Sequence, residues 1–148
     1  MRVLVDTNVL IRGANPSSPD AKIADEALAR LWTAGHDLCI VPQVLYEYWS
    51  VATRPVDVNG LGRPIEAVRL DIEKIKDLFS LLRDERGILE PWLQIATANR
   101  VRGKQAHDAR LVAAMHKHGL THLLTFNAAD FKRSQEIAIL DPEIVAKG

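Results

Sequence analysis

Short runs of consecutive apolar residues recur along the chain and predict the strands of one sheet. The first run, at residues 3–5, is continuous and rich in β-branched side chains, which favours a central strand buried on both faces of a parallel sheet. Runs at residues 38–41, 123–126 and 137–140 predict three more strands, and residues 88–89 predict a very short one. Helical patterns alternate with these runs, so the sequence indicates an α/β fold with a mainly parallel sheet.

Apolar side chains spaced three and four residues apart predict the helices. Ser18-Pro19-Asp20 supplies a capping residue, a proline for the first helical position and an acid, and predicts a helix that runs to Gly35. Pro42 opens the next helix, and a loop rich in glycine and proline at residues 54–63 separates it from a helix at residues 64–82. Three further helices are predicted at residues 91–101, 107–118 and 128–132.

The composition limits the class of protein. With 148 residues, 47% of them hydrophobic, the chain is expected to form a single domain over residues 1–148. Basic and acidic residues balance at 19 each, so a polyanionic partner would have to bind a local basic patch. The lone cysteine, Cys39, excludes an internal disulfide. The sequence contains no signal peptide and no apolar segment long enough to span a bilayer, so we expect a cytoplasmic protein without membrane contact.

Three carboxylates stand where an α/β domain has no packing use for charge. Asp6 directly follows the predicted central strand, at the edge where open α/β sheets bind ligands. Glu47 shares one helix face with Val44 and Tyr48, and Asp108 precedes the apolar stripe of its own helix. Each also has a structural alternative, because Asp6 and Asp108 can stabilise a helix start and Glu47 can pair with an arginine or a tyrosine hydroxyl.

The segment after the predicted strand at residues 123–126 offers further oxygen ligands. Thr125, Asn127 and Asp130 follow one another at the turn into a short helix. Capping of that helix by Asn127 is the structural alternative. The sequence leaves open whether Asn127 or Asp130 is the fourth member of the site.

Together these residues indicate a divalent cation. Three carboxylates in one crevice would repel one another and destabilise the fold unless a cation joined them. Oxygen ligands favour Mg²⁺ or Mn²⁺, and the sequence has no cluster of Cys and His that would favour zinc. The candidate metal ligands are therefore Asp6, Glu47, Asp108, Asn127 and Asp130, with Thr7, Asn8 and Thr125 as supporting polar residues.

Four segments give the chain a family resemblance. They are Val-Leu-Val-Asp-Thr-Asn-Val-Leu at residues 3–10, Glu47 in mid-helix, Gln-Ala-His-Asp-Ala-Arg-Leu-Val-Ala at residues 105–113, and Leu-Thr-Phe-Asn-Ala-Ala-Asp-Phe at residues 124–131. In this order and at this spacing they resemble a PIN-domain ribonuclease, and in particular the VapC-type toxins of toxin–antitoxin pairs.

The resemblance implies a three-layer α/β/α sandwich around a mainly parallel sheet. It also implies a Mg²⁺- or Mn²⁺-dependent endoribonuclease that forms a homodimer and is inhibited by a small protein antitoxin. The catalytic positions of the family fall on Asp6, Glu47, Asp108 and Asp130. The chain departs from the family's pattern at the fourth position, where Asn127 stands in the place of an acid.

An RNA substrate would need basic residues near the acids. Six lie close to them in the sequence and are the candidate RNA contacts: Arg100, Arg102, Lys104, Arg110, Lys132 and Arg133. Arg54 and Arg63, which bracket the loop at residues 54–63, are two further candidates for phosphate contacts. An ordinary solvated surface is the alternative for each of them.

Three other functions compete with the ribonuclease. One is a PIN-like module that has lost catalysis and binds RNA or a protein. Another is a DNA-directed or structure-specific nuclease of the same fold, which would normally be a larger chain than these 148 residues. The third is a Mg²⁺-dependent phosphatase of the haloacid-dehalogenase type, which also begins with an aspartate at a strand end. The phosphatase pattern resembles Asp-x-Asp-x-Thr, whereas this chain has Asn8 in place of the second aspartate, which argues against that reading.

Overall fold

The sheet is built outward from its central strand, β1 (Arg2–Val5), as predicted. The computed structural model describes every residue except 133 and 135, and within that part of the chain all strand pairs are parallel. The strand order is β3 (Ser80–Leu81), β2 (Asp37–Ile40), β1, β4 (His122–Leu124) and β5 (Ala138–Leu140). The chain therefore adds strands on one side of β1 first and then crosses to the other side, which puts the reversal of strand order between β1 and β4.

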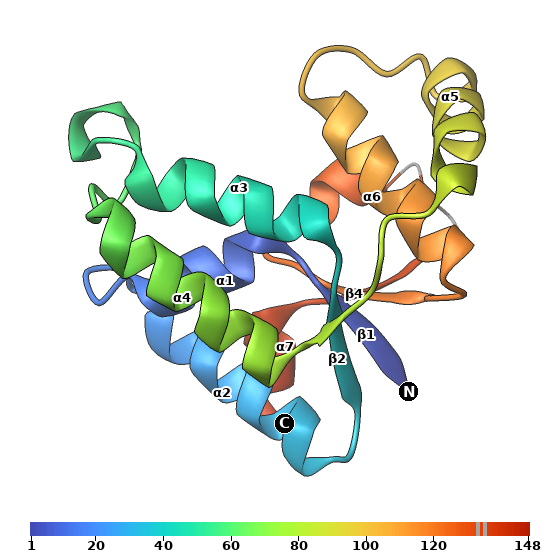
Figure 1. The fold of residues 1–148 in the computed structure, drawn as a ribbon. Coiled ribbons are helices and arrows are strands. Elements are labelled where there is room, and N and C mark those ends of the chain that lie inside the picture. The colour runs from blue at the N-terminus through green and yellow to red at the C-terminus, as the bar shows by residue number, and fades with distance from the viewer. Residues whose placement is uncertain (133, 135) are drawn as a thin grey trace.

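Two groups of helices cover the sheet and give the expected three-layer α/β/α arrangement (Figure 1). One group lies on one side of the sheet and consists of α1 (Thr7–Ala14), α2 (Ala21–Thr33), α3 (Pro42–Thr53), α4 (Ile65–Leu78) and α7 (Pro142–Lys147). The other group packs on the opposite side and consists of α5 (Leu89–Ala98) and α6 (Gln105–Lys117). Short 3-10 helices complete the described chain: η1 (Val56–Val58), η2 (Arg86–Ile88) and η3 (Ala128–Phe131).

The core forms where the strands meet these helices. Val3, Leu4 and Val5 are completely buried, as expected for a strand covered on both faces. Tyr48 of α3 is also in the core, and its hydroxyl donates to the carboxylate of Asp71 on α4 at 2.9 Å. None of the described helices is both long and apolar enough to cross a membrane.

Several predicted elements differ from the structure. Residues 88–89 do not form a strand, because Ile88 ends η2 and Leu89 begins α5. The edge strand lies instead at Ser80–Leu81, inside the segment predicted as the end of the helix at residues 64–82. That helix stops at Leu78 because Phe79 turns into extended backbone and buries its ring in the core.

The helix predicted from Ser18 starts later than expected. It begins at Ala21, and Ser18 instead accepts hydrogen bonds from the backbone amides of Asp20 and Ala21 in the preceding turn. Two helices, α1 and α7, were not predicted, and aspartate side chains cap both, Asp6 at α1 and Asp141 at α7.

Candidate metal-binding cleft

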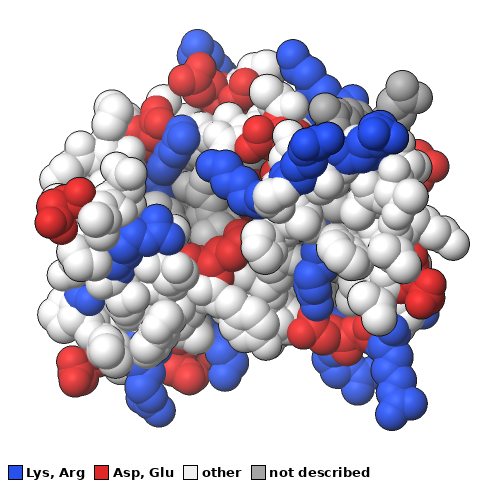
Figure 2. Space-filling model, turned by 90° about the horizontal axis from the view of Figure 1, so that it is seen from above, with Lys and Arg blue, Asp and Glu red and all other residues white. Residues whose placement is uncertain are grey.

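The candidate site is a cleft above the carboxyl ends of the central strands. It has a volume of about 610 Å³, and its lining includes Asp6, Glu47, Asp108, Asn127 and Asp130. Figure 2 shows acidic side chains in this hollow with basic side chains around its rim. The cleft sits where the strand order reverses between β1 and β4, which is the usual ligand site of an open parallel sheet. The structure thus brings together all five candidate ligands from four separate segments.

Asp6 is fixed in place by the turn that follows β1. Its Oδ1 accepts from the backbone amide of Thr7 at 2.8 Å, and its Oδ2 accepts from the hydroxyl of Thr125 at 2.8 Å and from the amide of Asn8 at 3.2 Å. Only 8% of Asp6 is exposed. Burial raises the pKa of Asp6 against the opposing effect of these hydrogen bonds, and the nearby charges of Glu47 and Asp130 raise it further.

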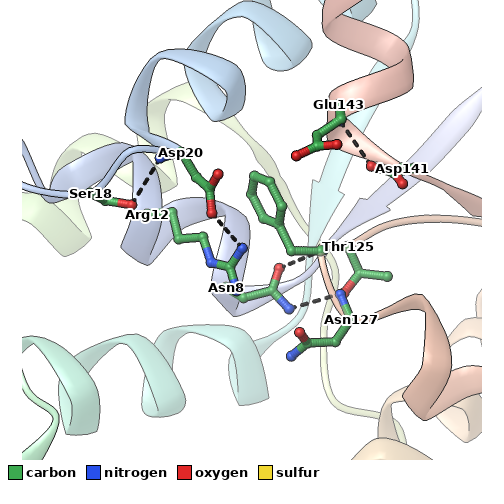
Figure 3. A network of polar contacts seen from close by, with 9 residues as sticks. Asn8, Arg12, Ser18, Asp20, Thr125, Asn127, Asp141 and Glu143 are labelled. Atoms are coloured by element: carbon green, nitrogen blue, oxygen red, sulfur yellow. Dashed lines mark hydrogen bonds and ion pairs between the residues drawn. The ribbon is translucent and has the colours of Figure 1, made fainter.

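The supporting polar residues tie β1 to β4. The side-chain amide of Asn8 donates to the Thr125 hydroxyl at 3.0 Å, and its oxygen accepts from the backbone amide of Phe126 at 3.0 Å. Figure 3 shows Asn8 beside Thr125, with Arg12 alongside. Thr125 is completely buried, and its hydroxyl also accepts from the backbone amide of Asn127 at 3.0 Å. The predicted supporting role of Asn8 and Thr125 therefore has a geometric basis.

Glu47 is held at both of its carboxylate oxygens. Oε2 accepts from the hydroxyl of Thr7 at 2.9 Å, and Oε1 accepts from the side-chain amide of Gln43 at 2.9 Å. Among the described residues, Glu47 therefore has threonine and glutamine partners, and the alternative pairing with an arginine or a tyrosine hydroxyl is not found. Gln43 was not among the predicted site residues, although it lies four residues before Glu47 on the same helix face, a spacing that favours contact between the two side chains.

Asp108 approaches the cleft from the opposite wall, in the first turn of α6. Burial raises the pKa of Asp108 to about 6, and the charges of Asp130, Asp6 and Glu47 raise it in addition. The charges of Glu47 and Asp130 thus raise the pKa values of both Asp6 and Asp108, and all four acids line the same cleft. Within the described part of the chain, no three acidic, histidine or cysteine side chains already stand close enough to hold one ion.

The last candidate segment provides one exposed acid and one exposed amide. Asn127 precedes η3 and does not cap it with its side chain, so the capping alternative fails for this residue. Asp130 lies within η3, and its charge raises the pKa of both Asp6 and Asp108. Both Asn127 and Asp130 line the cleft, and the structure therefore keeps both as candidate ligands.

The candidate RNA contacts divide into three groups. Lys104 lines the cleft together with Arg54, one of the two candidates that bracket the loop at residues 54–63. Arg100, Arg102 and Lys132 are exposed, and Arg133 lies outside the described residues. Arg110 is different, because its guanidinium donates to the carboxylate of Asp84 at 3.0 Å and to the side-chain oxygen of Gln43 at 3.1 Å.

The fold and the site define a class of protein: a doubly wound α/β domain whose acidic cleft lies at the reversal of its strand order. The PIN-domain family matches residues 3–136, so the chain belongs to this family and the predicted resemblance is confirmed. A comparison with curated proteins by sequence found no match.

Solved structures similar to this chain include several toxin–antitoxin complexes. VapBC2 from Rickettsia felis, bound to a promoter DNA fragment, has a TM-score of 0.72 at 15% identity over 95% of this chain and 98% of that one. VapBC-1 from nontypeable Haemophilus influenzae has a TM-score of 0.69 at 16% identity over 96% and 98%. VapC20 from Mycobacterium tuberculosis, a toxin that cleaves the sarcin-ricin loop, has a TM-score of 0.61 at 17% identity over 82% and 86%. At these identities the similarity shows a shared fold.

Proposed function

We propose that this protein is a Mg²⁺- or Mn²⁺-dependent endoribonuclease and the toxin of a toxin–antitoxin pair. The observation that carries the proposal is the gathering of Asp6, Glu47, Asp108 and Asp130, from four distant segments, in one cleft. Membership of the PIN-domain family and the likeness in fold to VapC structures support the same assignment.

The residues of the cleft fit a hard divalent cation. Their side chains offer carboxylate and amide oxygens, which Mg²⁺ and Mn²⁺ prefer. Burial, together with the neighbouring acids, raises the pKa values of Asp6 and Asp108, so ionising these carboxyls is costly in the metal-free cleft and a bound cation would offset that cost. When bound, such an ion would lower the pKa of a water molecule and neutralise the scissile phosphate.

The acidic residues would surround such an ion from two sides of the cleft. Asp6 and Glu47 form a fixed wall, because hydrogen bonds hold both oxygens of each carboxylate. Asp108 and Asp130 face them from α6 and η3. We propose Asp130 as the fourth acid because its charge acts on both Asp6 and Asp108, and Asn127 as a neutral oxygen ligand beside it.

Basic residues around the cleft would hold the RNA backbone. Arg54 and Lys104 are placed to contact the phosphates nearest the acids, because both line the cleft itself. Arg100 and Arg102 precede α6 and are exposed, so they would contact phosphates farther along the strand. Arg110 is the weakest of the candidates, since Asp84 and Gln43 already engage its guanidinium.

The proposed partners are an antitoxin and a second copy of the chain. The similar structures include a toxin–antitoxin complex from Klebsiella pneumoniae, with a TM-score of 0.61, which supports an antitoxin partner. Exposed apolar side chains on α3 and α5 are candidates for the dimer contact: Tyr46, Trp49, Leu89 and Leu93. Light scattering on the purified protein tests the dimer, since a mass of one chain would contradict it.

The decisive experiment is RNA cleavage with and without Mn²⁺. The wild-type protein should cleave RNA only when the metal is present, and Asp6→Asn should lose turnover while keeping its fold. Asp57→Asn is the matched control, because Asp57 is exposed on η1 and does not line the cleft. Cleavage by Asp6→Asn at a rate near that of the wild type would refute the assignment.

A PIN-like module that binds RNA without cleaving it is the second candidate. One observation favours it: no three of the described acids already stand at the spacing of a closed metal site. The same experiment separates the two functions. RNA binding that needs no metal, without cleavage at any Mn²⁺ concentration, would favour the binding module.

A further inference from the structure

Gln43 has a side chain that joins the two walls of the cleft. It lies in the first turn of α3, only 8% exposed, and each of its polar atoms has a partner. Its Nε2 donates to Oε1 of Glu47 at 2.9 Å and to the backbone oxygen of His107 at 2.8 Å. Its Oε1 accepts from Arg110 at 3.1 Å. One amide therefore contacts an acid of α3, the backbone of α6 and a cation of α6.

The orientation of this amide follows from the chemistry of its neighbours. A guanidinium can only donate hydrogen bonds, so it must face the amide oxygen. A carboxylate and a backbone carbonyl can only accept, so they must face the amide nitrogen. If the amide were rotated by half a turn, donor would face donor at Arg110, and acceptor would face acceptor at Glu47 and at His107. Among the side chains, only a neutral amide of this length meets the three demands together.

The contact with His107 matters because of the residue that follows. The carbonyl carbon of His107 is bonded to the backbone nitrogen of Asp108, so a hydrogen bond at that oxygen fixes the peptide that carries Asp108. The hydrogen bond to Glu47 fixes the acid on the other wall. Glu47 is thus held by hydrogen bonds from Thr7 and Gln43, and the side chain of Gln43 also connects it to the backbone at the start of α6.

We propose that Gln43 is a positioning residue that holds Glu47 and the first turn of α6 in register across the cleft. The inference deepens the proposed function, because the two acids that it aligns are proposed metal ligands. Hydrogen-bond partners of metal ligands typically change metal affinity by about 10- to 100-fold when they are removed. Gln43 is expected to act through Glu47 and Asp108 without touching the ion.

The test uses Gln43→Met, which keeps the length of the side chain and removes its hydrogen bonds. Two quantities are measured on the whole protein: the dissociation constant for Mn²⁺ by titration calorimetry, and amide hydrogen exchange over residues 104–111. We expect weaker Mn²⁺ binding, by about 10-fold or more, together with faster exchange at the start of α6. The matched control is Gln94→Met, at an exposed position of α5, and should change neither quantity.

A second variant guards against loss of the fold. Gln43→Asn keeps the amide but is one methylene shorter, so it can reach Glu47 or the His107 carbonyl but not both. Its Mn²⁺ affinity and exchange rate should fall between those of wild type and Gln43→Met. Circular dichroism verifies that each variant is folded. Unchanged Mn²⁺ affinity or unchanged exchange in a folded Gln43 variant would overturn the proposal.

Failure of this inference can be told apart from failure of the proposed function. If the wild-type protein binds no Mn²⁺, the proposed function fails, and the exchange at residues 104–111 alone decides whether Gln43 holds α6. If the wild-type protein binds Mn²⁺ and the Gln43 variants bind it equally well, the metal site stands and the role of Gln43 is refuted.

Discussion

Replacing Asp108 with asparagine should stabilise the metal-free protein at neutral pH. Burial and three neighbouring acids raise the pKa of Asp108 from 3.8 to about 6. The folded state therefore favours the protonated carboxyl, and this contribution to stability is complete below pH 3.8 and is lost as the pH rises through about 6. Asparagine carries no charge at any of these pH values, so the Asp108→Asn variant avoids that loss.

The magnitude follows from the two pKa values. A tenfold change in a protonation equilibrium is worth about 1.4 kcal/mol, which sets an upper limit of about 3 kcal/mol for the cost of the ionised Asp108. Solvent reaches this side chain and screens it, so about 1 to 2 kcal/mol is the more reasonable figure. Asp108 also lies in the first turn of α6, where a negative charge is favoured by about 0.3 to 1 kcal/mol. The cost of ionising this partly buried carboxyl beside three other acids should still be larger, leaving a net gain of about 1 kcal/mol for Asp108→Asn above pH 6.

The assay is urea unfolding in the presence of a chelator at several pH values from 4 to 7.5. The free energy of unfolding of Asp108→Asn should exceed that of the wild type near pH 7 and approach it near pH 4. Asp57→Asn, at an exposed position, should show no such dependence. A stability difference for Asp108→Asn that is the same at pH 4 and pH 7 would show that the ionisation of Asp108 is not its cause.

Metal should reverse this order of stability. Mn²⁺ at about 100 times its dissociation constant would add about 2.7 kcal/mol to the free energy of unfolding of the wild-type protein. Asp108→Asn lacks one of the proposed ligands and should gain much less. The wild type would then be the more stable protein at pH 7.5. If Asp108→Asn remains more stable when Mn²⁺ is saturating, Asp108 does not bind the ion.

Three further predictions follow from other parts of the structure. Thr125→Val should lower the free energy of unfolding by about 1 to 3 kcal/mol in urea titrations, because it removes the shorter of the two hydrogen bonds to the buried Oδ2 of Asp6 and the acceptor of the Asn127 backbone amide. An unchanged free energy of unfolding would contradict this. Gly60→Ala would bring its Cβ within 1.9 Å of the backbone oxygen of Arg54, so a lower melting temperature is expected, and an unchanged one would show that the loop adapts freely. Arg100→Glu combined with Arg102→Glu should weaken RNA binding. The slope of log affinity against log salt concentration should fall in magnitude by about 1.4, which corresponds to the loss of two phosphate contacts on a single strand. An unchanged slope would exclude both residues as phosphate contacts.

The sequence was most informative about the sheet and the acids. The apolar run at residues 3–5 correctly indicated a central strand, because a strand covered on both faces leaves a continuous apolar signal. The acids could be found because each interrupts an apolar pattern or follows a strand. The edge strand at Ser80–Leu81 could not be found in this way, since it has only two residues and both are exposed. This strand forms because it pairs with β2, and pairing between distant segments leaves no signal in the local pattern of apolar and polar residues.

The hydrogen-bond partners of acidic side chains could also not be predicted from the sequence pattern. Arg63 and Arg110 were both predicted as phosphate contacts, yet Arg63 makes a bidentate contact with Asp71 at 2.9 Å, and Arg110 donates hydrogen bonds to both Asp84 and Gln43. Both arginines pair with residues on other elements, and long-range partners of this kind depend on the tertiary fold. The hydrogen bond from Gln43 to Glu47 joins residues four apart in one helix and could have been predicted from the sequence. The hydrogen bond from Gln43 to the backbone of His107 in α6 could not.

Asp6 shows why the structural and functional interpretations of an acid need not exclude each other. Its Oδ1 accepts from the Thr7 amide and so caps α1, as the structural alternative required. Its Oδ2 is held by Thr125 and Asn8 at the floor of the cleft. The cap therefore orients the carboxylate, and the second oxygen is brought to the edge of β4, where the other acids gather. A helix start immediately after a central strand serves both purposes, because it fixes a side chain at the point where the sheet opens a ligand site.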